Sequence, residues 1–269
     1  MTDRFIELPE SPLAPGVSPV RVRYRDAGRG SPPLVFLHGG WGYAAYACGR
    51  QIGALASARR IVIPDRTGYG RSGRIADFPD DFHARAGVET MSVVDALGLE
   101  RPVLWGHSDG AIIALQLALA HPDRLAGVIV EATHLYRRKP ASRAFFESVA
   151  AEADVIGERA AAALLEEHGD GWRRLIARQA AAWLRIGEQA ASDTDDFYGG
   201  RLDTLRVPAL VVHGAGDRRT EPGELDALCR ALPRASVAVL PEGGHGPHGD
   251  PDTADEVTGA IQRFLADLT

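Results

Sequence analysis

The segment VLWGHSDGAIIALQLALA, residues 103–120, decides the fold of this chain. It begins as a short apolar strand, passes through GHSDG at residues 106–110 and continues at once as a helix that is apolar almost all round. Glycine at both ends of the turn allows strand and helix to approach closely, because a side chain would not fit there. G-x-S-x-G in this setting predicts a strained turn that presents the Ser108 hydroxyl at the end of the strand.

Short apolar runs rich in β-branched residues recur on both sides of this segment, with helical stretches between them. Near-continuous apolar strands that alternate with helices are typical of a mostly parallel sheet covered on both faces. We therefore predict an α/β protein. The predicted strands are residues 20–24, 34–37, 61–63, 103–105, 128–130, 210–212 and 237–240.

The strand pattern disappears in the segment 133–204, whose composition turns to Ala, Arg and Glu with scattered glycines that divide it into about three helices. One of these helices fits an ordinary crossover that covers the sheet. Roughly 70 residues are, however, far more than a single connection between strands uses. We predict a helical lid at 133–204, inserted into a core formed by residues 1–132 and 205–269.

A serine hydroxyl is a weak nucleophile at neutral pH, so it needs a base, and the base needs a partner that fixes its tautomer. Asp217 follows the predicted strand at 210–212, and His245 follows the predicted strand at 237–240. Both therefore lie at the same carboxyl edge of the sheet as Ser108. The order Ser, Asp, His along the chain is that of hydrolases with this kind of turn. We predict Ser108, Asp217 and His245 as the catalytic residues.

Two other residues compete for these roles. His248 lies three residues beyond His245 and is the alternative base, although the Gly243-Gly244 turn directly after the strand favours His245. Glu131 ends the predicted strand before the lid and is the alternative carboxylate for the histidine; we also predict it as a substrate-binding residue.

A tetrahedral intermediate carries an oxyanion that needs N–H donors. One predicted donor is the backbone N–H of Asp109, directly after the nucleophile. The second is expected from the glycine-rich loop after the strand at 34–37, where Gly40 is preferred and Trp41 is the next choice. His38 in the same loop is interpreted as a structural histidine that pairs with nearby backbone.

Composition excludes several other classes of protein. The chain has 269 residues, 45% of them hydrophobic, and a net charge of -6 without a basic stripe, so nucleic acid is not an expected partner. Its two cysteines, Cys48 and Cys229, stand far apart and outside any metal-ligand spacing. We expect no metal and no cofactor.

The beginning of the chain does not read as a secretory signal, since prolines interrupt its only apolar stretch and a basic start is missing. No apolar run approaches the roughly 18 to 20 residues that a membrane span needs. We expect a soluble, cytoplasmic protein that does not bind membranes. Its oligomeric state is not predicted.

Five motifs together resemble those of the α/β-hydrolase superfamily, from about residue 20 to residue 265. They are LHGGWG, DRTGYGRS, GHSDGA, VVHGAGD and PEGGHGPH, and they occur in family order. The resemblance implies the α/β-hydrolase fold and a serine hydrolase without a cofactor. The Ser108-Asp109 pair further resembles the subgroup of valacyclovir hydrolase-like enzymes, which cleave α-amino-acid esters and use the acid after the nucleophile to bind the substrate ammonium.

Asp109 therefore has two interpretations. A carboxylate in a partly dry cleft can pair with a substrate ammonium through a contact worth about 1.5 to 3 kcal/mol. A carboxylate in the first turn of a helix is also favoured by the helix dipole alone. Trp172 and Trp183 in the lid are interpreted as packing between helices.

The leading hypothesis is hydrolysis of a small carboxylic ester through an acyl-enzyme, with an α-amino-acid ester as one possible substrate. C–C bond hydrolases, lactonases and aminopeptidases of the same fold also keep a serine nucleophile. From another class, a ligand-binding protein that retains the catalytic residues with negligible turnover fits the same motifs.

Overall fold

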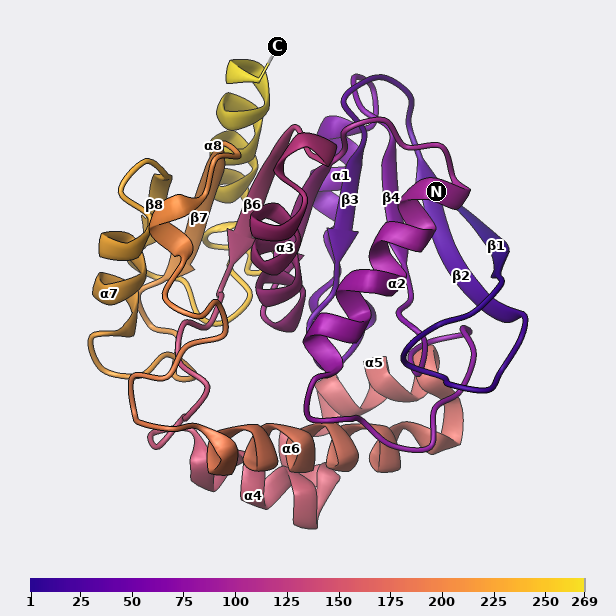
Figure 1. Cartoon of the computed structure of the whole chain (residues 1–269), viewed down its shortest axis with the longest axis vertical. Coiled ribbons are helices and arrows are strands. Elements are labelled where there is room, and N and C mark those ends of the chain that lie inside the picture. The colour runs from indigo at the N-terminus through magenta and orange to yellow at the C-terminus, as the bar shows by residue number, and fades with distance from the viewer. Residues whose placement is uncertain (269) are drawn as a thin grey trace.

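A single eight-stranded sheet forms the centre of the computed structural model, which describes residues 1–268 (Figure 1). The strand order is β1-β2-β4-β3-β5-β6-β7-β8. The pairs β1/β2 and β2/β4 are antiparallel. The six strands β3 to β8 are parallel to one another. This confirms the predicted α/β-hydrolase fold. The strands are β1 Thr2–Leu8, β2 Val20–Ala27, β3 Leu34–Leu37, β4 Ile61–Pro64, β5 Val103–His107, β6 Gly127–Glu131, β7 Ala209–Gly214 and β8 Ser236–Leu240.

Every predicted strand is present, and β1 is an additional one. Its first six residues are exposed or half-buried, and only Leu8 is buried. An edge strand that packs little of its surface lacks the continuous apolar run by which buried strands are found. The sequence pattern could not reveal β1 for that reason.

Helices cover both faces of the sheet. In Figure 1, α2 (Phe82–Ala96) and α3 (Asp109–Ala120) lie in front of the sheet, and α1 (Gly49–Leu55) and α8 (Ala254–Asp267) lie behind it. Alternate residues of each strand face the two layers. In β3, Val35 belongs to the front core with α2 and α3, whereas Phe36 belongs to the rear core with α1 and α8. The short helix α7 (Glu224–Ala231) also packs its apolar side against the front core.

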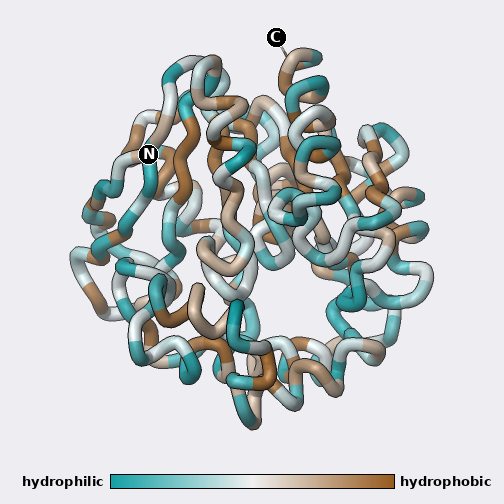
Figure 2. The backbone as a smooth tube through the Cα atoms, turned by 180° about the vertical axis from the view of Figure 1, so that it is seen from behind, coloured by the Kyte–Doolittle hydropathy of each residue, from teal (hydrophilic) through white to brown (hydrophobic). Residues whose placement is uncertain are grey.

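Three further helices occupy the segment between β6 and β7. They are α4 (Arg143–Ala151), α5 (Glu158–His168) and α6 (Trp172–Gln189), and Figure 1 shows them together below the sheet, beyond the carboxyl ends of the parallel strands. Ile176, Ala180 and Trp183 of α6 share one buried face. Figure 2 shows the matching alternation of hydrophilic and hydrophobic residues along the helices at the bottom of the view. The segment thus covers this edge of the sheet with an apolar surface.

Within residues 1–268, no helix has the length and apolar character needed to cross a membrane. The same part of the chain contains no group of three or more His, Cys, Asp or Glu side chains placed to hold a metal ion.

Candidate active site

The turn between β5 and α3 holds Ser108 in an unusual backbone conformation, with φ 53° and ψ -119°. A non-glycine residue there is strained, and the surrounding structure must hold it in place. A Cβ added to Gly106 would lie 2.2 Å from the carbonyl oxygen of Gly110. One added to Gly110 would lie 1.9 Å from that of Leu37 in β3. Both glycines are therefore required for the approach that places Ser108 at the sheet edge.

The structure brings Ser108, His245 and Asp217 into contact. His245 Nε2 lies 3.1 Å from Ser108 Oγ, and His245 Nδ1 lies 2.8 Å from Asp217 Oδ2. A neutral imidazole that donates its Nδ1–H to the carboxylate leaves Nε2 free to accept the serine proton. The geometry therefore suits transfer of the Ser108 proton to His245.

Neighbouring groups hold the two loops that carry Asp217 and His245. His107 lies directly before the serine and donates its Nε2–H to the carbonyl oxygen of His245 at 2.7 Å. The backbone N–H of Arg219 donates to Asp217 Oδ1 at 2.9 Å, so both carboxylate oxygens are engaged. The orientation of the histidine and of its acid is thus fixed by loops from three different strand ends.

The electrostatic environment keeps the histidine neutral and the acid ionised. Burial lowers the pKa of His245 below 6.5, and the nearby Arg219 cation lowers it further, against the opposing effect of Asp217. Burial alone would raise the pKa of Asp217, but the interaction and hydrogen bond with His245, together with the Arg219 N–H, hold that pKa far below its usual range. At neutral pH, His245 is therefore poised as a base.

Two backbone segments beside Ser108 carry the predicted oxyanion donors. The N–H of Asp109 belongs to the first residue of α3, where helix N–H groups have no carbonyl partner within the helix. Gly40 and Trp41, in the loop after β3, line the same small cavity as Ser108. A Cβ on Gly40 would lie 2.2 Å from Gln179 Nε2 of α6, so any other residue at this position requires the Gln179 side chain to move.

His38 connects the loop after β3 to the loop after β4 through hydrogen bonds. Its Nδ1 lies 2.8 Å from the Gly39 carbonyl oxygen, and its Nε2 accepts the backbone N–H of Arg66 at 3.1 Å. The interpretation of His38 as a structural residue is confirmed. The guanidinium of Arg66 donates to the Gly39 carbonyl oxygen at 2.9 Å and adds a second hold on the same loop.

The side chain of Asp109 is bonded within the protein. The residue is 1% exposed, and it is absent from the lining of the cavity beside Ser108. Its carboxylate bonds to His83 Nε2 at 3.1 Å, Gln179 Nε2 at 2.9 Å and Trp183 Nε1 at 3.0 Å. These donors fasten α2 and α6 to the start of α3. A contact between this carboxylate and a substrate ammonium stays a prediction.

Glu131, which was predicted to contact the substrate, is surrounded by other residues of the protein. It is fully buried, and Oε1 accepts the backbone N–H of His248 at 2.9 Å and lies 2.7 Å from His248 Nδ1. Its Oε2 accepts the indole N–H of Trp105 at 3.2 Å. The other ring nitrogen of His248 lies 2.8 Å from the Tyr46 carbonyl oxygen. Glu131 thus pairs with the alternative base, and neither residue lines the cavity at Ser108.

The cavity at Ser108 is small and nearly closed, with a volume of about 20 Å³. A space of this size holds about one water molecule. Loops of the sheet form one side, and α4 and α6 form the other through Phe145, Phe146, Gln179 and Trp183. A substrate therefore needs these helices or their side chains to move before it reaches Ser108.

Several residues of the cavity were not predicted from the sequence. Trp183 lines it and bonds to Asp109, whereas its helical spacing indicated only packing. His134 lies just beyond β6, and its ring stacks on that of His245 at 5.8 Å between centroids. Arg219 stands two residues after Asp217, with no motif to mark it. These contacts join segments far apart in the chain, so local patterns carry no signal for them.

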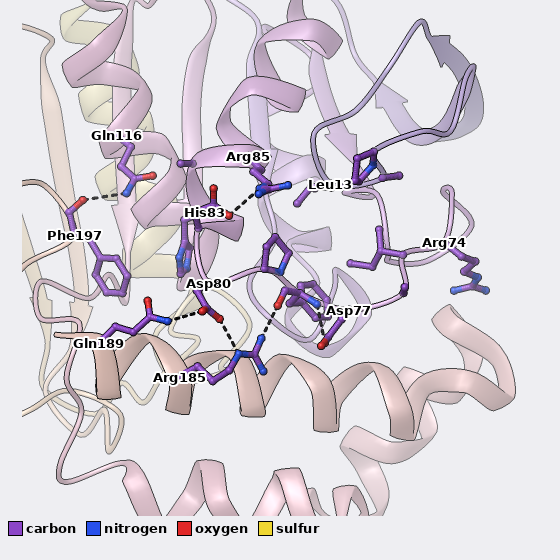
Figure 3. A pocket seen from close by; sticks show the side chains of 18 of the residues that line it. Leu13, Arg74, Asp77, Asp80, His83, Arg85, Gln116, Arg185, Gln189 and Phe197 are labelled. Carbon is purple, nitrogen blue, oxygen red and sulfur yellow. Dashed lines mark hydrogen bonds and ion pairs between the residues drawn. The ribbon is translucent and has the colours of Figure 1, made fainter.

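A larger groove of about 1130 Å³ lies on the other side of His83, between α2, α6 and the loop before α2 (Figure 3). Arg185 and Gln189 of α6 both bond to Asp80 there, at 2.7 and 2.5 Å. Ser108, Asp217 and His245 do not line this groove. Its bonds fasten α6 to the loop before α2, and the groove has no part in the arrangement at Ser108.

A sheet of this order, with polar loops gathered at the carboxyl ends of its parallel strands, belongs to the class of α/β proteins that form their sites at that edge. A family model described as "Alpha/beta hydrolase family" matches residues 34–257. The chain belongs to the alpha/beta hydrolase family.

Relatives with known names agree with the family. The chain is 31% identical over 229 residues to the "Putative carbamate hydrolase RutD" of Caulobacter sp., covering 79% of this chain and 83% of the relative. It is 26% identical over 252 residues to the "Serine hydrolase BPHL" of Homo sapiens, covering 93% and 84%. The relatives' names span several substrates, so they give the family and no single substrate class.

Solved structures share the fold at lower sequence identity. A thermophilic esterase from Thermogutta terrifontis matches with a TM-score of 0.72 and 23% identity, over 98% of this chain and 99% of that one. An enol-lactonase from Burkholderia xenovorans LB400 matches with a TM-score of 0.65 and 21% identity, over 92% and 97%.

Proposed function

We propose that this protein is a serine hydrolase that cleaves small carboxylic esters through an acyl-enzyme. The observation that carries the proposal is the contact chain from Ser108 Oγ to His245 Nε2 at 3.1 Å and from His245 Nδ1 to Asp217 Oδ2 at 2.8 Å. The strained turn at Ser108 and the neutral state of His245 support it. The proposal does not extend to an α-amino-acid ester, because three protein donors bond to the Asp109 carboxylate.

The proposed reaction uses the Ser108 hydroxyl, the His245 imidazole and two backbone N–H groups. Ser108 Oγ attacks the ester carbonyl carbon while His245 Nε2 takes its proton, and the backbone N–H groups of Asp109 and Gly40 hold the resulting oxyanion. The intermediate collapses, and the alcohol leaves with the proton from His245. Water then attacks the acyl-serine, His245 takes a proton from that water, and Ser108 leaves with it, which releases the acid.

The segment 133–204 acts as the lid in this proposal. Phe145, Phe146 and Trp183 close the cavity over Ser108 and leave room for about one water. Opening of this segment admits the ester. Its closure then excludes bulk water and strengthens the hydrogen bonds to the oxyanion.

Rapid mixing with an activated ester tests the acyl-enzyme. With 4-nitrophenyl butyrate in excess, we expect a burst of up to one 4-nitrophenol per active site, followed by a slower steady state, if hydrolysis of the acyl-serine limits turnover. Mass spectrometry of enzyme quenched during the steady state is expected to show the butyryl group on the peptide that contains Ser108. An acyl group on another residue, or saturable ester binding without turnover, would contradict the proposal; the second result would favour a ligand-binding protein.

The pH dependence follows from the state of His245. Only the neutral imidazole accepts the serine proton, and burial together with Arg219 lowers its pKa below 6.5. We therefore expect kcat/KM for an uncharged ester to fall on acidification with a midpoint below pH 6.5. The profile is measured at constant ionic strength, and circular dichroism at each pH serves as the control for unfolding. A midpoint above pH 6.5 in folded protein would be inconsistent with this environment.

A further inference from the structure

Arg219 places an unpaired positive charge at the wall of the cavity that contains Ser108. Among the described residues 1–268, its guanidinium has no hydrogen bond and no ion pair; only its backbone is bonded, through N–H to Asp217 and through C=O to Ser142. Other arginines that are largely removed from solvent do pair: Arg23 contacts Asp65 at 3.1 Å. Buried arginines that lack an acid partner, such as Arg66, donate to backbone carbonyl oxygens instead. The guanidinium of Arg219 has neither kind of partner among the described residues.

Two aromatic rings hold this guanidinium in place. Its central carbon lies 4.6 Å from the centroid of the Trp41 ring and 4.8 Å from that of the Phe145 ring. The two rings are 6.1 Å apart and tilted by 34°. Contacts between a guanidinium and aromatic faces are favourable and leave the N–H groups at its edge free for hydrogen bonds. Trp41 belongs to the core and Phe145 to α4, so Arg219 lies where the two parts meet.

The rest of the cavity offers no competing charge. Of the described residues that line it, Arg219 is the only one with a permanently charged side chain. Phe146, Val149, Ala180 and Trp183 form apolar walls. His134 is buried, and within residues 1–268 its Nδ1 has no hydrogen-bond partner. A cation in such surroundings attracts an anion far more strongly than the same cation in water.

We infer that Arg219 binds a carboxylate carried by the substrate, so that the preferred esters are those of dicarboxylic acids or of carboxylate-bearing alcohols. The inference rests on the proposed ester hydrolysis and names its substrate class. The planar guanidinium presents two parallel N–H groups that match the two oxygens of a carboxylate. Its position, two residues beyond Asp217, places the charged end of the substrate beside the loop that carries the acid of the catalytic residues.

Matched esters that differ only in charge test the inference. The first pair is the 4-nitrophenyl monoester of adipic acid and its methyl-capped counterpart, which share one leaving group. The second pair is 3-carboxyphenyl butyrate and 3-carbamoylphenyl butyrate, which place the charge on the leaving group. We expect the anionic member of at least one pair to be preferred in kcat/KM by about ten- to a hundredfold.

Variants at two adjacent arginines supply the comparison. Arg219→Gln is expected to abolish the preference for the anionic ester, and Arg219→Lys to retain part of it, because a lysine keeps the charge without the planar pair of N–H groups. Arg218→Gln is the matched control, since Arg218 is exposed and does not line the cavity. Its preference is expected to equal that of the wild type. Rising salt is expected to weaken the preference in the wild type.

Binding to an inactive variant separates this inference from the proposed function. Calorimetric titration of the intact adipate monoester into Ser108→Ala is expected to show binding that weakens about ten- to a hundredfold in Ser108→Ala/Arg219→Gln. Equal rates within both pairs of esters, or equal binding to these two variants, would overturn the role of Arg219 while leaving ester hydrolysis intact. Charge-dependent binding without turnover of any ester would support the carboxylate site and overturn the proposed hydrolysis.

Discussion

Replacement of Ser108 by alanine is expected to lower kcat for 4-nitrophenyl butyrate by about 10⁶-fold. The variant keeps the oxyanion donors and the cavity, so the loss measures the nucleophile and its base. Alanine removes the hydroxyl oxygen that lies 3.1 Å from His245 Nε2, and water in a cavity of about 20 Å³ is not held in the same position. Steady-state release of 4-nitrophenol, compared with the uncatalysed rate, gives the remaining activity.

The base supplies the control for this prediction. His245→Ala is expected to lose about as much activity as Ser108→Ala, and the double variant little more than either, because the two side chains act as one unit. If the loss of kcat in the double variant equals the product of the two single losses, the two side chains act independently. Retention of more than about one per cent of wild-type kcat in pure Ser108→Ala would remove Ser108 from the nucleophile's role.

Asp217→Asn is expected to lower kcat by about 10⁴-fold. The amide side chain has nearly the same shape, but it presents an N–H or a neutral oxygen where the carboxylate now accepts the Nδ1–H of His245 at 2.8 Å. The histidine then loses both the tautomer that accepts the serine proton and the charge that stabilises its protonated form. Measurement of kcat and of the urea unfolding midpoint in the same samples separates this loss from a loss of folded protein.

Glu131→Gln is the matched control for the acid. Glu131 was the other carboxylate candidate from the sequence, but it is fully buried against His248 and Trp105 and does not line the cavity. Loss of its charge opposite His248 is expected to lower the free energy of unfolding by about 3 kcal/mol. Its kcat should stay within about tenfold of the wild type in folded samples. A larger kcat loss in Glu131→Gln than in Asp217→Asn would reverse the assignment of the acid.

The fold and the strand ends that carry the candidate site could be predicted from the sequence, because short local patterns mark them. A G-x-S-x-G turn between a buried strand and a buried helix is marked by its glycines within a few residues of sequence. The structure shows a local close approach at Gly106, to Gly110, whereas Gly110 approaches Leu37 of the neighbouring strand β3. Asp217 and His245 could be named because each follows a strand, and parallel strands end at one edge. β1 escaped prediction because an exposed edge strand has no continuous apolar run.

Side-chain directions at the site could not be read from the sequence in the same way. Asp109 directly follows Ser108 in the chain, yet the orientation of its carboxylate is set by Gln179 and Trp183, about seventy residues later. Arg219 follows Asp217 closely, but Trp41 and Phe145, which hold its guanidinium, come from two distant segments. Such contacts exist only after the helices have packed.

The bonds of Asp109 limit how freely this protein can exchange its covering helices. Its backbone N–H is a proposed oxyanion donor, and its side chain is the point at which α6 is attached through Gln179 and Trp183. A chimera that receives foreign helices in place of residues 133–204 inherits a buried carboxylate with two of its three donors gone, one residue from Ser108. Without these donors, the buried charge lowers the free energy of unfolding by several kcal/mol and favours movement of the adjacent turn. The covering segment and the turn at Ser108 therefore have to change together when such proteins diverge or are engineered.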